Sequence, residues 1–383
     1  MAGKAKRKGQ SEYFFDYSLL LIILFLLGFG LVMIFSTSSY EAAQDYGRST
    51  FFLEKQLFAS ILGLIAMIVV ANIPYHFWAK FAGLAYAVAA VLILLIIPFG
   101  KEANGAKRWL IVAGISLQPA EVAKLAMILC LAVLVSKMGK GIRKAKGFFM
   151  VLMVPVPIVL MVWRITSNMS SAIIIMGIAI LMLFVASPDY KKFVVMALLV
   201  IAVAAVGIYA IVNLADTSGL DFRGERILAW LDPEAYADGK GFQTLQALYA
   251  IGSGGIWGKG LGQSMQKLGF IPEAQNDMIF SIICEELGLF GAISIILMFL
   301  MLIWRLMVIA NNAPDLFGAL LVVGVLGHIA IQVILNIAVV TNTIPNTGIS
   351  LPFISYGGSS VMFLLVEMGM VLNVAKRIQL KEM

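Results

Sequence analysis

The sequence predicts an all-α polytopic membrane protein with about ten transmembrane helices and a large ordered extracytoplasmic loop between the seventh and the eighth. Composition and the length of the apolar runs support this prediction. Hydrophobic residues make up 61% of the 383 residues and charged residues only 13%. The mean hydropathy of +0.97 lies far outside the range of water-soluble globular proteins.

Ten apolar runs are predicted to span the membrane: 17–35, 57–73, 81–99, 119–135, 149–163, 171–186, 193–213, 278–304, 316–340 and 354–374. Each must be helical, because backbone groups find no water in lipid and the alternation of a barrel strand is absent. We expect one membrane domain over 1–383, with a basic arm at 1–15.

Lysine and arginine are distributed unevenly between the two sides of the membrane. If the N-terminus lies inside, basic residues gather in the inner segments 4–8, 137–146, 191–192 and 376–381. The short outer segments then hold only Arg48, Lys55, Lys101, Lys107, Arg108 and Arg164. This asymmetry predicts that both termini are cytoplasmic. The net charge of +7 is therefore mainly an orientation signal, and we expect no nucleic-acid partner.

Few residues are suited to metal or nucleotide chemistry. The two cysteines and two histidines are isolated along the chain, so neither a disulfide framework nor a zinc site is predicted. Walker A, dinucleotide and GxSxG motifs are absent. We therefore expect no nucleotide or organic cofactor.

The segment 214–277 is the longest between two predicted spans, and loops of this length are usually functional or disordered. Its aromatic residues, glycine turns and apolar periodicity predict that it is ordered. "FQTLQALYAI" is typical of a short helix at the membrane surface. Arg223 and Arg226 could grip a phosphate or a carboxylate, although isolated arginines are more often ordinary surface charges.

The stretch "IPEAQNDMIFSIICEELG" (271–288) places four carboxylates at the start of an apolar helix. Asp277 is either a helix N-cap or a functional acid. Glu285 and Glu286 lie about 12–14 Å further along the helix, a depth at which carboxylates are costly unless they are paired or face a wet cavity. Asp277 and Glu285 are about two turns apart, so we expect them on nearly the same face.

A second polar group lies in "GAKRWLIVAGISLQPAEVAKLAMILC". Lys107 and Arg108 beside Trp109 suit a phosphate headgroup at the interface. Glu121 and Lys124 are three residues apart on a helix and are expected to pair within the membrane. That pair could serve the substrate or only hold helices together.

A third group is "NTIPNTGISLPFISYGGSSVMFLLVEMG", where Pro345, Pro352 and two glycines interrupt the helical pattern. Irregular backbone at membrane depth is tolerated where it lines a cavity. Ser355 and Gly357 are therefore candidate substrate contacts, and the alternative is a plain loop before the last span.

These motifs, "GAKRWL", "QPAEVAK", "GFQTLQALYAIGSGGIWGKGLGQS", "IPEAQNDMIFSIICEELGLFG" and "LPFISYGGSS", occur in this order across ten spans. The chain thereby resembles the SEDS family (shape, elongation, division and sporulation) from about residue 16 to residue 377. It looks more like the branch of FtsW and its spore-cortex relative than like the elongation protein RodA.

The resemblance implies a peptidoglycan glycosyltransferase in the bacterial cytoplasmic membrane. Such proteins polymerise lipid II, an undecaprenyl-pyrophosphate-linked disaccharide, into β-1,4 glycan strands. Their partners are a class B penicillin-binding protein, other division or elongation proteins, and membrane lipids. The family's essential acid falls on Asp277 and the second acid of that helix on Glu285. Its membrane ion pair falls on Glu121 and Lys124, and its loop tryptophan on Trp109.

The chain departs from the family pattern at "TSNMSSA", where relatives commonly have "QPDLGT". Asn168 stands in place of the aspartate and Ser167 in place of the proline. An uncharged amide cannot supply the same electrostatics.

The mechanism we expect is a single in-line displacement, because an α-linked donor gives a β-1,4 product. Asp277 is the candidate general base. Lys107, Arg108, Lys124, Arg223 and Arg226 are candidates to neutralise the departing pyrophosphate. A divalent cation, Mg²⁺ or Mn²⁺, could bridge Asp277 and phosphate. The alternatives are a lipid II flippase, which inverted repeats would favour, and a non-catalytic scaffold of the division machinery.

Overall fold

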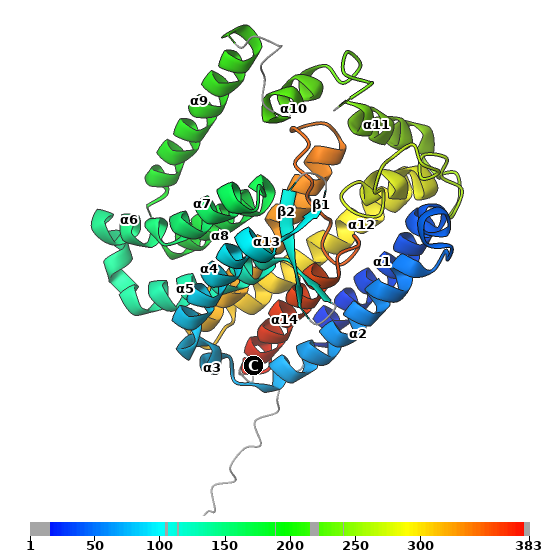
Figure 1. Cartoon of the computed structure of the whole chain (residues 1–383). Coiled ribbons are helices and arrows are strands. Elements are labelled where there is room, and N and C mark those ends of the chain that lie inside the picture. The colour runs from blue at the N-terminus through cyan, green and yellow to red at the C-terminus, as the bar shows by residue number, and fades with distance from the viewer. Residues whose placement is uncertain are drawn as a thin grey trace, which may run out of the picture.

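The computed structural model describes residues 16–103, 106–112, 115–187, 189–214, 222–239 and 241–378. Ten helical stretches in this part of the chain are long and apolar enough to cross a membrane, which confirms the predicted fold class. They form a bundle, and Figure 1 shows α10 and α11 together at one end of it. We call this end the loop end. The described C-terminal residues lie at the opposite end.

The helices that form the first half of the bundle are α1 (Tyr17–Tyr46), α2 (Phe51–Asn72), α3 (Tyr75–Lys80), α4 (Ala82–Phe99), α5 (Pro119–Met138), α6 (Ala145–Met153), α7 (Pro155–Ile165) and α8 (Met169–Ala186). A 3₁₀ turn (Gly139–Arg143) joins α5 to α6. The second half comprises α9 (Tyr190–Leu214), α10 (Phe222–Leu231), α11 (Phe242–Gly254), α12 (Ile279–Asn311), α13 (Leu316–Val340) and α14 (Gly358–Ala375).

Three predicted spans differ from the structure in ways that have physical causes. The predicted span 149–163 is two helices, α6 and α7, because Pro155 cannot continue the hydrogen-bond ladder of a helix. The first helix continues to Tyr46 instead of ending at residue 35, and its polar part is held by contacts of Ser36 with Glu286 of α12 and with Lys267 of the loop after α11. The last helix begins at Gly358 and not at residue 354, because 341–357 is irregular.

A small antiparallel sheet, which the sequence did not predict, joins α4 to α5. Its strands are β1 (Lys101–Ala103), β2 (Ala106–Val112) and β3 (Ile115–Leu117), in the order β1-β2-β3. Lys107 pairs with Glu102 across the sheet. Side chains alternate along β2, so that Lys107 points outward while Leu110 is buried.

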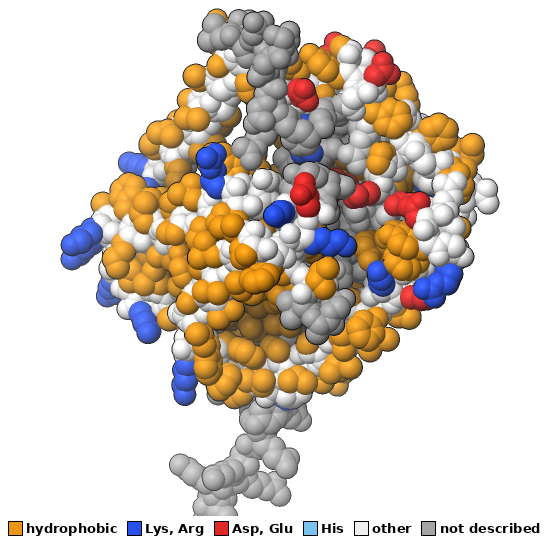
Figure 2. All heavy atoms as spheres, viewed as in Figure 1, with side chains coloured by type: hydrophobic (Ala, Val, Ile, Leu, Met, Phe, Trp, Pro, Cys, Tyr) orange, Lys and Arg blue, Asp and Glu red, His pale blue; other side chains and the backbone are white. Residues whose placement is uncertain are grey.

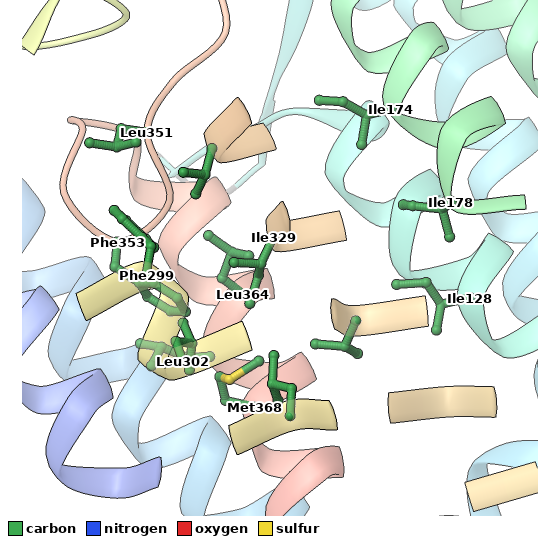
Figure 3. Packing of buried hydrophobic residues seen from close by; sticks show 14 of the residues in the cluster. Ile128, Ile174, Ile178, Phe299, Leu302, Ile329, Leu351, Phe353, Leu364 and Met368 are labelled. Carbon is green, nitrogen blue, oxygen red and sulfur yellow. The ribbon is translucent and has the colours of Figure 1, made fainter. Parts of the chain in front are cut away.

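The core lies where α12, α13 and α14 meet α2, α5 and α8. Figure 3 shows Phe299 and Leu302 of α12, Ile329 of α13, and Leu364 and Met368 of α14 close together. Small residues bring α2 and α14 into close contact. A Cβ on Gly369 would lie 2.6 Å from the Met67 carbonyl oxygen, so only glycine fits there.

The helix α12 is broken at Gly288, whose φ of 66° and ψ of −166° are not helical. The Gly-rich segment after α11 supplies backbone hydrogen bonds to the residues on both sides of this break. Lys259 and Gly260 donate their N–H groups to the carbonyls of Glu285 and Glu286 at 2.9 Å. The N–H groups of Leu289 and Phe290 in turn donate to the carbonyls of Gly255 and Ile256 at 2.9 and 3.1 Å. Backbone groups that the helix leaves unpaired are thus satisfied without water.

Candidate active site

Asp277 lies in the turn just before α12, at the loop end of the bundle. Met278, not Asp277, occupies the N-cap position of α12, so the capping interpretation of Asp277 is wrong. Asn336 of α13 donates to the Asp277 carbonyl oxygen at 2.8 Å and fixes the main chain there. A Cβ on Gly348 would lie 3.6 Å from Oδ2 of Asp277, so the segment 341–357 passes close to the carboxyl group.

Burial raises the pKa of Asp277 to about 6, and the negative charge of Glu273 adds to the shift. The positive charge of Arg226 and backbone N–H groups oppose it. Burial likewise lowers the pKa of Arg108. The pKa of Arg226 is lowered by burial and by repulsion from Arg108, while Asp277 acts in the opposite direction. The three side chains therefore share one electrostatic environment.

The two arginines come from different parts of the chain and are held by backbone carbonyls. Arg226 of α10 donates from Nη1 to the Asn346 carbonyl at 3.2 Å. Arg108 of β2 donates from Nη2 to the Ser167 carbonyl at 3.1 Å. In Figure 2, acidic side chains and several Lys and Arg side chains gather in the upper half of the visible face, toward α10 and α11.

Alternation along β2 separates residues that the sequence grouped together. Arg108 faces inward, whereas Lys107 and Trp109 lie on the other face of the strand. The three side chains are thus divided between two faces of the strand, and the predicted phosphate contact of Lys107 and Arg108 beside Trp109 stays a prediction. Arg223 lies in α10, but its side chain is outside the described part of the structure.

Glu121 and Lys124 form the predicted ion pair. Their Oε1 and Nζ atoms are 2.8 Å apart, and both side chains are buried in α5. Ser360 at the start of α14 donates to Glu121 Oε2 at 3.3 Å. Gln332 of α13 accepts from Lys124 at 3.5 Å and donates to the Ser350 carbonyl at 2.9 Å. The pair thus ties α5 to α13, α14 and the segment 341–357.

Ser355 and Gly357 are engaged within the protein. The Ser355 hydroxyl accepts the N–H of Leu351 at 2.7 Å and is buried. The N–H of Gly357 donates to Gln56 Oε1 of α2 at 3.1 Å. These contacts shape the segment 341–357, and the predicted substrate role of either residue stays a prediction.

Glu285 does not share the surroundings of Asp277, contrary to the expectation from helical spacing. Its fully buried carboxylate lies 2.6 Å from Lys259 Nζ. It also accepts hydrogen bonds from the Ser264 hydroxyl and, at 3.1 Å, from the Met265 N–H. Every one of these partners lies in the segment that follows α11. Glu285 therefore anchors that segment to α12.

Glu286 makes a parallel set of contacts. Its carboxylate lies 2.7 Å from Lys267 Nζ and accepts from the Ser36 hydroxyl of α1 at 2.8 Å. Lys267 also donates to the Ser36 hydroxyl at 3.1 Å. The two deep carboxylates of the stretch 271–288 are thus paired, which offsets the cost of burying them.

Asn168, which stands where the family resemblance leads us to expect an aspartate, is the N-cap of α8. Its Oδ1 accepts the Ser171 N–H at 3.0 Å. Asparagine caps a helix about as well as aspartate, so the substitution keeps this structural role while removing a charge. The neighbouring Ser167 has a φ of 49° and accepts from Arg108.

In the described residues, no group of three or more His, Cys, Asp or Glu side chains is arranged to hold a metal ion. Repulsion from the negative charge of Glu273 contributes to the raised pKa of Asp277. A cation held at Asp277 would relieve this repulsion, and Mg²⁺ is usually held by one or two carboxylates together with substrate phosphates.

One set of residues was missed by the sequence analysis. His328, Gln332 and Asn336 are buried on α13, four residues apart and therefore on one face of the helix. His328 Nδ1 lies 2.8 Å from Glu367 of α14. Gln332 accepts a hydrogen bond from Lys124, and Asn336 donates one to the Asp277 carbonyl. The signal was a row of polar residues in an otherwise apolar span.

The fold and the site together define a polytopic membrane protein with a half-buried aspartate and two half-buried arginines at one end of its helix bundle. A family model described as cell cycle protein (FtsW, RodA, SpoVE) matches residues 17–380. The chain belongs to this family.

Individual relatives agree with this assignment. The chain is 39% identical to stage V sporulation protein E of Bacillus subtilis over 363 residues, which cover 94% of this chain and 97% of that protein. It is 37% identical to a probable peptidoglycan glycosyltransferase FtsW of Trichlorobacter lovleyi, over 96% of this chain and 94% of the relative. A solved structure described as a peptidoglycan synthase complex that coordinates polymerization and crosslinking contains a similar chain. The TM-score is 0.78 and the identity 25%, over 94% of this chain and 97% of that one.

Proposed function

We propose that this protein is a peptidoglycan glycosyltransferase that polymerises lipid II into β-1,4 glycan strands. The observation that carries the proposal is the environment of Asp277, a half-buried carboxyl with a pKa of about 6 that shares its surroundings with Arg226 and Arg108. A general base works best when its pKa lies near the operating pH. Relatives named as peptidoglycan glycosyltransferases support the same conclusion.

The chemistry requires a base and a site for a leaving anion. Formation of a β-1,4 bond from an α-linked pyrophosphate donor inverts the anomeric carbon, as a single in-line displacement does. Asp277 takes the proton of the attacking 4-hydroxyl group. Arg108 and Arg226 stabilise the negative charge that develops on the departing pyrophosphate. Lys124 is neutralised by Glu121 and instead positions the segment 341–357.

If a divalent cation takes part, Asp277 would hold it together with phosphate oxygens of the substrate, and it would supply additional positive charge to the leaving group. The residues of the chain keep the same roles in this arrangement.

The proposed setting is the bacterial cytoplasmic membrane, with the loop end outside and both termini in the cytoplasm. The basic residues of 137–146 and 376–381 support this orientation through the positive-inside rule. In this orientation Asp277 lies at the outer side, where a lipid-linked precursor would present its headgroup.

The proposed partner is a class B penicillin-binding protein, together with other division or elongation proteins. Exposed apolar side chains on α4 and α12, among them Leu94, Leu297 and Leu300, offer faces on which another protein's helix could pack. The complex that contains the similar chain is described as coordinating polymerization and crosslinking, which supports a crosslinking partner.

The deciding experiment is polymerisation by the purified chain in detergent, supplied with lipid II and no membrane gradient. Glycan strands are expected on a gel. A flippase or a scaffold would leave lipid II unchanged under these conditions, and that result would refute the proposal.

A further inference from the structure

A polar pocket lies beside Asp277, and the proposed chemistry leaves most of it unused. It measures about 170 Å³ and lies between α10, the start of α11 and the segment 341–357. Its lining includes Arg226, Trp230, Gly239, Gln243, Thr244 and Asn346. Only Arg226 belongs to the candidate active site described above.

The pocket borders the catalytic region through a short stretch of backbone. Arg226, which lines the pocket, donates to the Asn346 carbonyl at 3.2 Å. The Asn346 side chain accepts the N–H of Gly348 at 3.1 Å. A Cβ on Gly348 would lie 3.6 Å from Asp277 Oδ2. A ligand in the pocket would therefore lie next to the reacting groups.

The polar lining is held in place by internal hydrogen bonds. Asn346 Nδ2 donates to Gln243 Oε1 at 3.0 Å, and Gln243 Nε2 donates to the Pro272 carbonyl at 3.3 Å. Each amide has two N–H bonds, so each retains capacity for a ligand. Trp230 Nε1 donates to the Asn342 carbonyl at 3.0 Å, which fixes the indole ring. Groups fixed in this way lose little entropy when a ligand binds.

The chemistry of the lining favours a sugar. An indole offers an apolar surface with a defined orientation, while the amides and the guanidinium group offer donors to hydroxyl and carbonyl oxygens. A sugar ring presents an apolar face and a rim of such oxygens. The volume of about 170 Å³ corresponds to roughly six water molecules, which suits one monosaccharide unit and not two.

We propose that this pocket is a saccharide subsite, in which one sugar unit of the glycan strand is held beside Asp277. Trp230 is its platform, and Gln243 and Asn346 are its hydrogen-bonding groups. The assignment rests on the proposed polymerase function. It predicts that the pocket influences strand length, because a subsite for the polymer keeps the strand bound between successive additions.

Gly239 allows the pocket to be blocked with little disturbance. Its φ is not in the left-handed region, and the nearest atom to an added Cβ is the Tyr236 carbonyl oxygen at 3.9 Å. Gly239→Leu should place a side chain in the pocket. Gly252→Leu is the matched control, because Gly252 is exposed at the far end of α11 with nothing within 4 Å of an added Cβ.

The full-length purified variants would be supplied with lipid II in detergent, and strand length and kcat/KM measured. We expect shorter strands and a kcat/KM about tenfold lower for Gly239→Leu, the effect of one or two lost hydrogen bonds, with Gly252→Leu unchanged. Gln243→Leu should act in the same direction, and it serves as the test if Gly239→Leu fails to give a monodisperse protein.

The outcomes separate the two proposals. Absence of strands with the unmodified chain would overturn the polymerase function. Normal strands from the unmodified chain, Gly239→Leu and Gln243→Leu alike would overturn only the subsite. Inhibition by inorganic pyrophosphate should be equal in all variants. Weaker inhibition in Gly239→Leu would assign the pocket to the leaving group and refute a sugar subsite.

Discussion

Asp277 differs from the deeper carboxylates of its segment in what surrounds it. Glu285 and Glu286 each lie within 2.7 Å of a lysine ammonium group, so their charge is matched inside the protein. Burial is instead the largest influence on Asp277 and raises its pKa to about 6. The group is therefore suited to gain and lose a proton near neutral pH, whereas the other two are suited to hold structure.

Replacement of Asp277 by Asn should abolish polymerisation and leave the fold intact. Loss of a general base typically costs about 10²–10⁴-fold in rate, and Met278, not Asp277, is the helix cap. The rate of strand formation by purified protein measures the effect. Asp238→Asn, at an exposed carboxylate of the same loop, is the control and should be fully active. A near-normal rate for Asp277→Asn would remove the catalytic assignment.

The pH dependence of polymerisation should report the titration of Asp277. The base acts when deprotonated, so kcat/KM should rise with pH through about 6 and level off above it. Glu273→Gln removes a charge that raises this pKa, so the rising limb should move to lower pH. Arg226→Gln removes a charge that lowers it, and the limb should move to higher pH. A limb that stays in place in both variants would mean that another group titrates.

The same pKa shift has a consequence for stability. A carboxyl whose pKa is higher in the folded state than its usual value of about 3.9 favours folding only while it is protonated. That contribution is present at low pH and is lost as the pH rises through about 6. Deprotonated Asp277 thus works against stability under the conditions in which it acts as a base.

At the scale of single elements, the break in α12 depends on the segment that follows α11. The positive φ of Gly288 ends the first part of the helix, and the backbone of 255–260 replaces the missing helical hydrogen bonds. Glu285 and Glu286 hold that segment through Lys259, Ser264 and Lys267. The break and the carboxylates therefore form one structural unit.

Substitution of Glu285 by Gln should lower stability much more than catalysis. A hydrogen bond to a charged group contributes about 1.5–3 kcal/mol, and Glu285 is fully buried. Thermal denaturation in detergent should show a lower midpoint, while the rate per folded molecule stays close to normal. Glu102→Gln, at an exposed strand position, is the control. Unchanged stability with loss of polymerisation would instead indicate that Glu285 contacts the substrate.

At the scale of the whole molecule, the distribution of basic residues predicts that the loop end faces outward. A cysteine at Asp238 should react with a membrane-impermeant maleimide in intact cells, and a cysteine at Lys144 only after permeabilisation. Both positions are exposed, whereas the native Cys284 is buried and Cys130 partly so. The reverse labelling pattern would show that the loop end faces the cytoplasm, and Asp277 would then not lie at the outer side of the membrane.

A crosslinking partner should also act on the whole molecule. We expect strand formation to increase severalfold when the matching class B penicillin-binding protein is purified together with this chain. Equal rates with and without it, in the same detergent and at the same lipid II concentration, would contradict the proposed partnership.

The sequence by itself determined the fold class, the number of spans and the Glu121–Lys124 pair. These features are local: the cost of an unpaired backbone in lipid depends on the length of one apolar run, and residues three apart on a helix must be neighbours. The helix α11 is local in the same sense, because the pattern of its own stretch of sequence predicted it.

Only the tertiary structure decided which polar residues share a site. Spacing placed Asp277 and Glu285 on one helix face, but the segment after α11 packs against Glu285 and supplies its lysine partner, Lys259. The strand β2 turned Arg108 toward Ser167 and left Lys107 on the other face. Asp277, Arg108 and Arg226 share one electrostatic environment because a turn, a strand and a helix that are distant in sequence pack together. Packing depends on the shapes of all the elements at once, and the period of any single one does not reveal it.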